Sequence, residues 1–243
     1  MMRVLAVDAG NSRIKWGVWE DEWSSQGSTP TAHVNTLGAA WSTLPRGYAI
    51  YASSVAGPHV RTWLDEWARM RGIEVHWLAS RQEQCGVRNA YREPSQLGTD
   101  RWASLIAAWH FVRGAALVVN AGTAVTIDAL DSAGAFRGGV IVPGLDLMAG
   151  ALVSGTAGLP AAPGAFAAFP DNTADAIASG ALLAVCGAID RMSNGLAGGG
   201  ATPQIVLSGG AAAAVAARLG VPVLNVPYLV LEGLRIVAQS EHA

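Results

Sequence analysis

Four short apolar runs, arranged as two pairs, stand out in the hydrophobic pattern of this 243-residue chain. In each pair an apolar run ends in Asp or Asn, passes through an Ala-Gly turn and continues as a second β-prone run. Short apolar runs bounded by glycine-containing turns predict buried strands joined by a tight hairpin. The four runs are Leu5–Asp8, Ile14–Trp19, Leu117–Asn120 and Val125–Leu130.

The two predicted hairpins resemble one another closely enough to indicate an internal repeat. Asp8 and Asn120 are 112 residues apart, close to half the length of the chain. A repeat at this period favours a duplicated domain over a chance likeness of eight residues. We therefore predict an N-terminal half over residues 1–114 and a C-terminal half over residues 115–243.

The remaining pattern alternates between strands and helices within each half, with loops expected at Gly86–Gln96 and Gly195–Gly200. This order predicts an α/β protein whose two halves face each other across a cleft. Further strands are expected at Tyr48–Ser53, Glu74–Leu78, Ala135–Val142, Ile205–Leu207 and Pro222–Val226. Helices are expected from Pro58 to Gly72, over Thr99–Arg113, from Thr173 to about Leu196, up to Gly220 and from Tyr228 onward.

Composition narrows the classes of function. Hydrophobic residues make up 51% of the chain and charged residues 14%, which is typical of a globular protein. A net charge of −2 argues against a nucleic-acid or anionic-membrane partner. The two cysteines, Cys85 and Cys186, lie outside any metal-ligand spacing and fit a reducing cytosol. We find no continuous apolar stretch of about 18 residues, so no membrane span is expected.

The first hairpin turn, Asp8 to Ser12, carries the sharpest motif. Glycine lets backbone N–H groups approach a phosphate closely, and Asn11 and Ser12 add short polar side chains. Asp8 at the strand end is suited to hold Mg²⁺, directly or through water. Lys15 is the only lysine of the chain and is suited to lie along phosphates. The alternative is an ordinary hairpin turn, which the second copy makes less attractive.

The second half offers two further phosphate or nucleotide elements. In the hairpin Asn120–Ala124, Thr123 is a candidate phosphate donor, and two such hairpins from facing halves would grip a triphosphate. The turn Ser208-Gly209-Gly210 follows a predicted strand and opens a helix, so it is a candidate for the adenosine side.

A loop running into a helix, Tyr91 to Trp102, supplies candidates for the substrate side. An aspartate such as Asp100 is a natural base for a substrate hydroxyl during phosphoryl transfer. Arg101 is suited to an acidic substrate. The alternative is a helix N-terminus where Asp100 only complements the helix dipole.

These motifs, in this order and spacing, resemble the type III pantothenate kinases over nearly the whole chain. The motifs are Asp8-x-Gly-Asn-Ser, Tyr91 with Pro94 and Leu97-Gly98-Thr99-Asp100-Arg101-Trp102, Gly122-Thr123-Ala124-x-Thr126-x-Asp128, Gly138-Gly139-x-Ile141-x-Pro143-Gly144, and Asn172-Thr173. The resemblance implies two duplicated actin-like, or ribonuclease H-like, halves with a nucleotide cleft between them. It also implies a cytoplasmic homodimer that phosphorylates pantothenate with ATP and Mg²⁺, the first step of coenzyme A synthesis.

Carried over by position, the resemblance assigns roles to two sets of residues, with Asp100 as the proton acceptor. The residues implied to bind ATP are Asp8, Ala9, Gly10, Asn11, Ser12, Arg13, Ile14, Lys15 and Thr123. The residues implied to line the pantothenate pocket are Tyr91, Gly98, Thr99, Asp100, Arg101 and Thr173.

One position departs from the family pattern. Many members have an aspartate that binds a monovalent cation where this chain has Asn120. A neutral amide is a weaker cation ligand than a carboxylate, so the requirement for K⁺ or NH₄⁺ is left open. Two other functions stay open at this point: a kinase of the same fold for another hydroxylated substrate, and a non-catalytic regulatory accessory factor.

Overall fold

The computed structural model describes residues 3–42, 44, 47–156, 158–159, 162–198 and 202–242. Its contacts divide the chain into two compact units. The first comprises Met1–Phe111 together with Tyr228–Ala243, and the second comprises Val112–Pro227. We describe each unit by itself.

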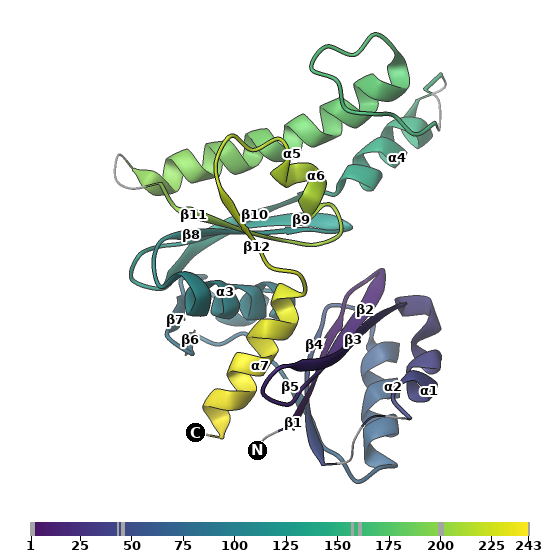
Figure 1. The fold of residues 1–243 in the computed structure, drawn as a ribbon, viewed down its shortest axis with the longest axis vertical. Helices are drawn as coiled ribbons and strands as arrows, with labels where there is room; N and C mark the ends of the chain where they lie inside the picture. Colours follow the sequence, from purple (N-terminus) through teal and green to yellow (C-terminus); the bar gives the residue numbers. More distant parts are fainter. Residues whose placement is uncertain are drawn as a thin grey trace. The chain divides into compact units, whose positions relative to one another are not determined.

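A mixed sheet forms the centre of the first unit, with strand order β3-β2-β1-β4-β5 (Figure 1). The strand β1 pairs antiparallel with β2 and parallel with β4, so β1 is the central strand. The strands are β1 (Arg3–Ala9), β2 (Arg13–Trp19), β3 (Trp23–Pro30), β4 (Tyr48–Ser54) and β5 (Val75–Trp77).

Helices cover both faces of this sheet, which explains why β1 is a continuous buried run rather than an alternating one. Leu5, Val7 and Ala9 pack into the core on the face of α1 (Leu37–Ala40) and α2 (Pro58–Arg69). On the opposite face, α7 (Leu229–Glu241) packs on β1, β2 and β4. The unit also contains β6 (Glu83–Gln84), β7 (Val87–Asn89), α3 (Thr99–Val112), and the 3₁₀ turns η1 (Thr31–Thr36) and η2 (Pro94–Gln96).

The C-terminal helix α7 belongs to the first unit, whereas the predicted C-terminal half runs to residue 243. Polar contacts fix α7 to the sheet: the indole N–H of Trp23 donates to Glu232 at 2.6 Å. The hydroxyl of Tyr51 donates to Glu241 at 3.0 Å. The contacts therefore correct the end of the predicted C-terminal half: residues Tyr228–Ala243 complete the first unit.

The second unit repeats the strand order of the first. Its strands lie in the order β12-β11-β8-β9-β10, with β8 antiparallel to β9 and parallel to β11. Each position thus matches one in the β5-β4-β1-β2-β3 order of the first unit. The elements are β8 (Ala116–Ala121), β9 (Ala124–Leu130), β10 (Ala135–Pro143), α4 (Leu145–Gly155), α5 (Thr173–Ala197), β11 (Gln204–Ser208), α6 (Ala212–Ala216) and β12 (Val223–Asn225).

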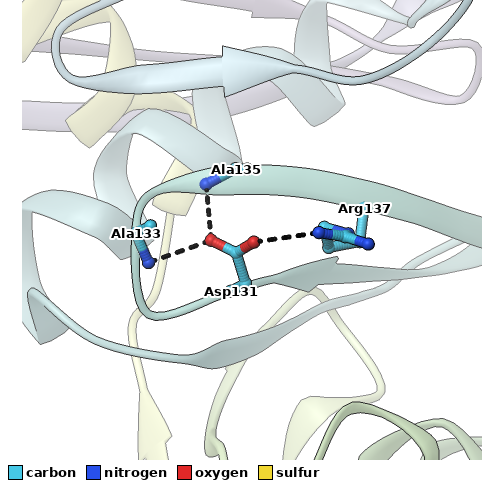
Figure 2. A network of polar contacts seen from close by, with 4 residues as sticks. All are labelled: Asp131, Ala133, Ala135 and Arg137. Atoms are coloured by element: carbon cyan, nitrogen blue, oxygen red, sulfur yellow. Dashed lines mark hydrogen bonds and ion pairs between the residues drawn. The ribbon is translucent and has the colours of Figure 1, made fainter.

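The turn between β9 and β10 is organised by one carboxylate (Figure 2). Asp131 accepts hydrogen bonds from the backbone N–H groups of Ala133 and Ala135, each at 2.9 Å. The guanidinium of Arg137 lies 3.4 Å from the other carboxylate oxygen. Because an aspartate side chain can satisfy successive backbone donors, it stabilises this turn.

The helix α5 is the core helix of the second unit. Among the described residues it is the one helix long and apolar enough to cross a membrane by length and composition alone. It packs on β8 and β9, and Leu182, Val185 and Ile189 enter the core there. Packing of this kind accounts for the apolar residues on that face of the helix.

The predicted hairpins and the main helices are confirmed, and the differences concern marginal elements. Strand β3 and helix α4 were not expected, because β3 is a half-exposed polar strand and α4 is short and largely exposed. The expected loop Gly86–Gln96 contains β7 and η2. Helix α5 continues to Ala197 into the expected turn Gly195–Gly200, of which residues 199 and 200 lie outside the described residues.

A close approach of α7 to α3 gives a test of the first unit's packing. A Cβ placed on Gly233 would lie 2.8 Å from the Cα of Ala103 and closer still to its carbonyl. We expect Gly233→Ala to lower the free energy of unfolding by about 1–3 kcal/mol, as overpacking does. Thermal unfolding followed by circular dichroism measures the change. Gly180→Ala in α5 is the control, since its Cβ meets nothing within 4 Å. An unchanged Gly233→Ala variant would contradict the packing described.

Candidate active site

Asp8 lies near the carboxyl end of the central strand β1. In the sheet it is directly opposite Lys15 of β2 and beside Ser53 of β4. Residues paired across neighbouring strands project from the same face of a sheet. The register therefore places a carboxylate, an ammonium group and a hydroxyl side by side on three neighbouring strands, near the carboxyl end of β1.

The electrostatic surroundings of Asp8 are unusual for a carboxylate. Its side chain is 7% exposed, and Oδ1 is buried without a hydrogen-bond partner. Burial raises the pKa of Asp8 to about 7; the charge of Lys15 lowers this pKa and that of Asp100 raises it. A buried carboxylate oxygen left unpaired has a strong preference for a cation.

Mg²⁺ fits this position. It is a hard cation that binds carboxylate oxygens and keeps several of its waters. The orphaned Oδ1 of Asp8 offers such a ligand. Among the described residues no group of three or more His, Cys, Asp or Glu side chains gathers to hold a metal. A metal at Asp8 would therefore rely on waters and on phosphate oxygens for its other ligands.

Asp100 begins the candidate substrate side, in the first turn of α3. Burial raises the pKa of Asp100, while hydrogen bonding from the backbone N–H of Arg101 at 2.8 Å and the charge of Arg101 lower it. The start of α3 is tied to the strand beside Asp8, because the Thr99 hydroxyl lies 2.9 Å from that of Ser53, which is paired with Asp8. This arrangement provides a half-buried candidate base in the same unit as a candidate metal ligand.

Ser53 is a site residue that sequence reasoning missed. Its hydroxyl lies 2.9 Å from that of Thr99, the first residue of α3, and its side chain is fully buried. This contact ties the start of α3 to β4, beside Asp8. No local pattern marks Ser53, because its partner lies 46 residues away.

Gly98 makes room for the carboxylate of Asp100. A Cβ at Gly98 would lie 2.6 Å from Oδ1 of Asp100 and 3.7 Å from Val55. A side chain there would push Asp100 out of its position. A glycine is thus needed here because a side chain would collide with Asp100, and not because the backbone adopts an unusual conformation.

Arg101 and Tyr91 form a second pair on this side. Arg101 is only 5% exposed, and its guanidinium donates to the Tyr91 hydroxyl at 3.3 Å. The loop is held by Asn89, which accepts from the Tyr91 N–H at 3.1 Å and donates to the Pro94 carbonyl at 3.2 Å. A buried guanidinium of this kind is suited to bind a carboxylate.

The residues of the first hairpin that are predicted to bind ATP are of two kinds, buried and exposed. Ala9 and Ile14 are fully buried and belong to the core, so they offer only backbone to a ligand. Asn11, Ser12 and Arg13 are exposed. The Gly10 N–H donates to the Arg13 carbonyl at 3.1 Å and closes the turn.

In the second unit, Asn120 occupies the position that Asp8 has in the first. It lies opposite Thr126 of β9 and beside Ser208 of β11. The Ala211 N–H donates to the Ala121 carbonyl at 3.0 Å, as the Ala56 N–H donates to the Ala9 carbonyl at 3.1 Å in the first unit. The two units thus share strand pairing and backbone hydrogen bonds at these positions, but the side chains in the second unit are neutral.

Thr123 and Thr173 also belong to the second unit. Thr123 is exposed in the β8–β9 turn, and Thr173 is exposed as the first residue of α5. Asn172 caps this helix by accepting from the Asp175 N–H at 3.0 Å and donating to the Asp175 carboxylate at 2.7 Å. Their predicted contacts with ATP and substrate stay predictions.

The raised pKa of Asp8 predicts a pH-dependent stability in the absence of Mg²⁺ and nucleotide. The folded protein holds a proton that the unfolded chain releases near 3.8, so stability falls as pH rises from about 4 to about 7. In Asp8→Asn this loss is absent. We expect the melting temperature of Asp8→Asn minus that of wild type to increase over this range and to level off above pH 7. Asp21→Asn, an exposed aspartate, is the control; a flat difference for Asp8→Asn would refute the expectation.

Comparison with known proteins identifies the family of the chain. Residues 4–195 match the family model described as type III pantothenate kinase. The type III pantothenate kinase of Nitrosospira multiformis is 44% identical over 239 residues, covering 98% of this chain and 91% of that protein.

Two solved structures share the fold. A putative Baf family transcriptional activator from Campylobacter jejuni has a TM-score of 0.63 at 19% identity, covering 98% of this chain and 100% of that one. A putative 2-dehydro-3-deoxygalactonokinase from Sinorhizobium meliloti has the same score and identity, covering 98% and 99%. The predicted α/β fold of the actin-like and sugar-kinase type is confirmed. The chain belongs to the type III pantothenate kinase family.

Proposed function

We propose that this protein transfers the γ-phosphoryl group of ATP to the primary hydroxyl of pantothenate, giving 4′-phosphopantothenate for coenzyme A synthesis. Full-length relatives named for this activity support it. The observation in the structure that carries it is the half-buried Asp100 at the start of α3, whose charge raises the pKa of Asp8, a carboxylate with one oxygen unpaired.

Asp100 acts as the general base in this proposal. Its pKa is raised by burial, which makes its carboxylate a stronger base than an exposed aspartate. It accepts the proton of the substrate hydroxyl as the oxygen attacks the γ-phosphorus and ADP leaves. Phosphoryl transfer needs little covalent chemistry from the protein, so the position of the Asp100 carboxylate matters. Gly98 leaves space for this carboxylate, and the Thr99–Ser53 contact fixes the start of the helix that carries it.

The first hairpin supplies the phosphate side. Asp8 would hold Mg²⁺, directly or through water, and the chemistry that the ion supplies is neutralisation of phosphate charge. Lys15, opposite Asp8, adds a positive charge along the phosphates. In the first turn, Asn11 and Arg13 offer backbone donors, and Thr123 offers a hydroxyl from the second hairpin.

Pantothenate carries a carboxylate, and Arg101 is the proposed partner for it. The buried guanidinium is already oriented by the Tyr91 hydroxyl. Tyr91, Gly98, Thr99 and Thr173 complete the proposed pocket.

We further propose a cytoplasmic homodimer without a nucleic-acid or membrane partner. The net charge of −2 argues against such partners. The second unit exposes large apolar side chains on β10 and α4, namely Ile141, Leu147 and Leu152. A second copy of the chain would cover such residues.

Replacing the proposed base tests the mechanism. We expect Asp100→Asn to lower kcat by a factor of about 10²–10⁴ while ATP binding is retained. An ADP-release assay with pantothenate and a panel of sugars measures both the loss and the substrate class. Asp21→Asn, an exposed aspartate in the turn between β2 and β3, is the control. A kcat that hardly moves in Asp100→Asn would mean that Asp100 is not the base, and turnover of a sugar instead of pantothenate would reassign the substrate.

The neutral side chain of Asn120 predicts a weak response to monovalent cations. An amide oxygen binds K⁺ less well than a carboxylate, and its neighbours Thr126 and Ser208 are neutral too. We expect the wild-type kcat to change by less than about twofold when K⁺ or NH₄⁺ replaces a bulky organic cation, and Asn120→Asp to respond more strongly. Strong K⁺ activation of the wild type would show that Asn120 suffices as a ligand.

A further inference from the structure

Thr31 lies directly after strand β3, beside the turn of the first hairpin, and its side chain is only 5% exposed. Its hydroxyl donates to the carbonyl of Gly10 at 2.7 Å. Its backbone N–H donates to the carbonyl of Ser12 at 3.0 Å. A single residue therefore holds two carbonyl groups of the turn that contains the proposed phosphate donors.

These two bonds determine the direction of the turn's N–H groups. In a trans peptide the C=O of one residue and the N–H of the next point in opposite directions. No cis peptide bond occurs among the described residues. Because the Gly10 and Ser12 carbonyls point toward Thr31, the N–H groups of Asn11 and Arg13 point away from it. Two donors on the opposite side of a turn make a concavity suited to a phosphate oxygen.

The second unit has a different residue at the matching place. Pro30 pairs with Arg13 at the end of β3, and Pro143 pairs with Ala124 at the end of β10. The next residue there is Gly144, whose N–H donates to the Thr123 carbonyl at 2.9 Å. The backbone bond is thus common to both units, whereas the hydroxyl bond belongs to Thr31 alone of the two.

A difference in turn length explains the extra bond. Ala9 pairs with Ile14, which leaves four residues in the first turn, and Ala121 pairs with Val125, which leaves three in the second. The longer turn has one more peptide group to orient. In the shorter turn a side chain has no room, since a Cβ on Gly144 would collide with the carbonyls of Gly122 and Thr123.

We infer that Thr31 is a positioning residue for nucleotide binding: its hydroxyl fixes the longer first turn so that its N–H groups face the phosphates of ATP. This rests on the proposed assignment of the first hairpin to ATP. Arg13 supports the same arrangement from the side, because its guanidinium donates to the Ser28 hydroxyl of β3 at 2.6 Å.

The decisive substitution is Thr31→Val, which keeps the branched shape and removes the donor. The Gly10 carbonyl then loses its partner and the peptide group is free to turn. A net hydrogen bond of about 1 kcal/mol corresponds to a change of about fivefold to tenfold in binding. We expect the KM for ATP and the Kd for a non-hydrolysable ATP analogue to rise by about that factor. The KM for pantothenate stays within about twofold.

Two matched variants separate positioning from a general structural role. Thr31→Ser keeps the hydroxyl and is expected to restore ATP affinity to within about twofold of wild type. Thr36→Val removes a hydroxyl that donates to the His33 carbonyl at 2.8 Å in the same 3₁₀ segment, away from the turn. It is expected to leave both KM values unchanged. If Thr31→Val does not fold, Thr31→Ala removes the same donor and is measured in the same way.

The outcomes distinguish this inference from the proposed function. Wild-type turnover of pantothenate with an unchanged ATP KM in Thr31→Val overturns the role of Thr31 and leaves the kinase assignment intact. Equal weakening of ATP and pantothenate, or a loss that Thr31→Ser does not restore, also overturns it. Absence of pantothenate turnover in the wild type, with analogue binding that Thr31→Val weakens, supports Thr31 and removes the substrate assignment.

Discussion

The burial of one carboxylate, Asp8, at the end of the central strand of the first unit is the constraint on which the site depends. A carboxylate that loses its water must gain a counter-charge, hold a proton or bind a cation. The register of the sheet provides Lys15 as a partial counter-charge and leaves one oxygen unpaired. The surrounding elements, from the Ser53–Thr99 contact to the turn held by Thr31, keep that oxygen and the neighbouring donors in place.

The two units show how one backbone plan is given two electrostatic characters. Both units have the same strand order. In both, the carbonyl of the residue after Asp8 or Asn120 accepts a hydrogen bond from a backbone N–H in the segment that follows the neighbouring parallel strand. The side chains at matching sheet positions differ: Asp8, Lys15 and Ser53 in one unit, Asn120, Thr126 and Ser208 in the other. Among these matching positions charged side chains occur only in the first unit, and those of the second unit are neutral.

The parts of the fold and site that could be predicted are those that depend on residues close together in the sequence. The hairpins follow from apolar runs and glycine turns, and Asp100 follows from its place at the start of a helix. Thr31 and Ser53 could not be found in this way, because their partners lie 21 and 46 residues away and an isolated hydroxyl has no periodicity. The membership of α7 in the first unit was missed for the same reason: an amphipathic helix indicates that it packs, but not on which sheet.

The return of α7 to the first unit affects how the protein is made. Synthesis proceeds from the N-terminus, and N-terminal domains usually fold first. Here the face of β1 and β4 opposite α2 stays uncovered until Leu231, Leu234 and their neighbours have been translated, because these buried side chains come from the last helix. The second unit, continuous from Val112 to Pro227, is able to complete its own core earlier. The nascent chain therefore carries an open apolar sheet face until α7 has been made, and a ribosome that stops short of residue 228 releases a chain whose first unit is unfinished.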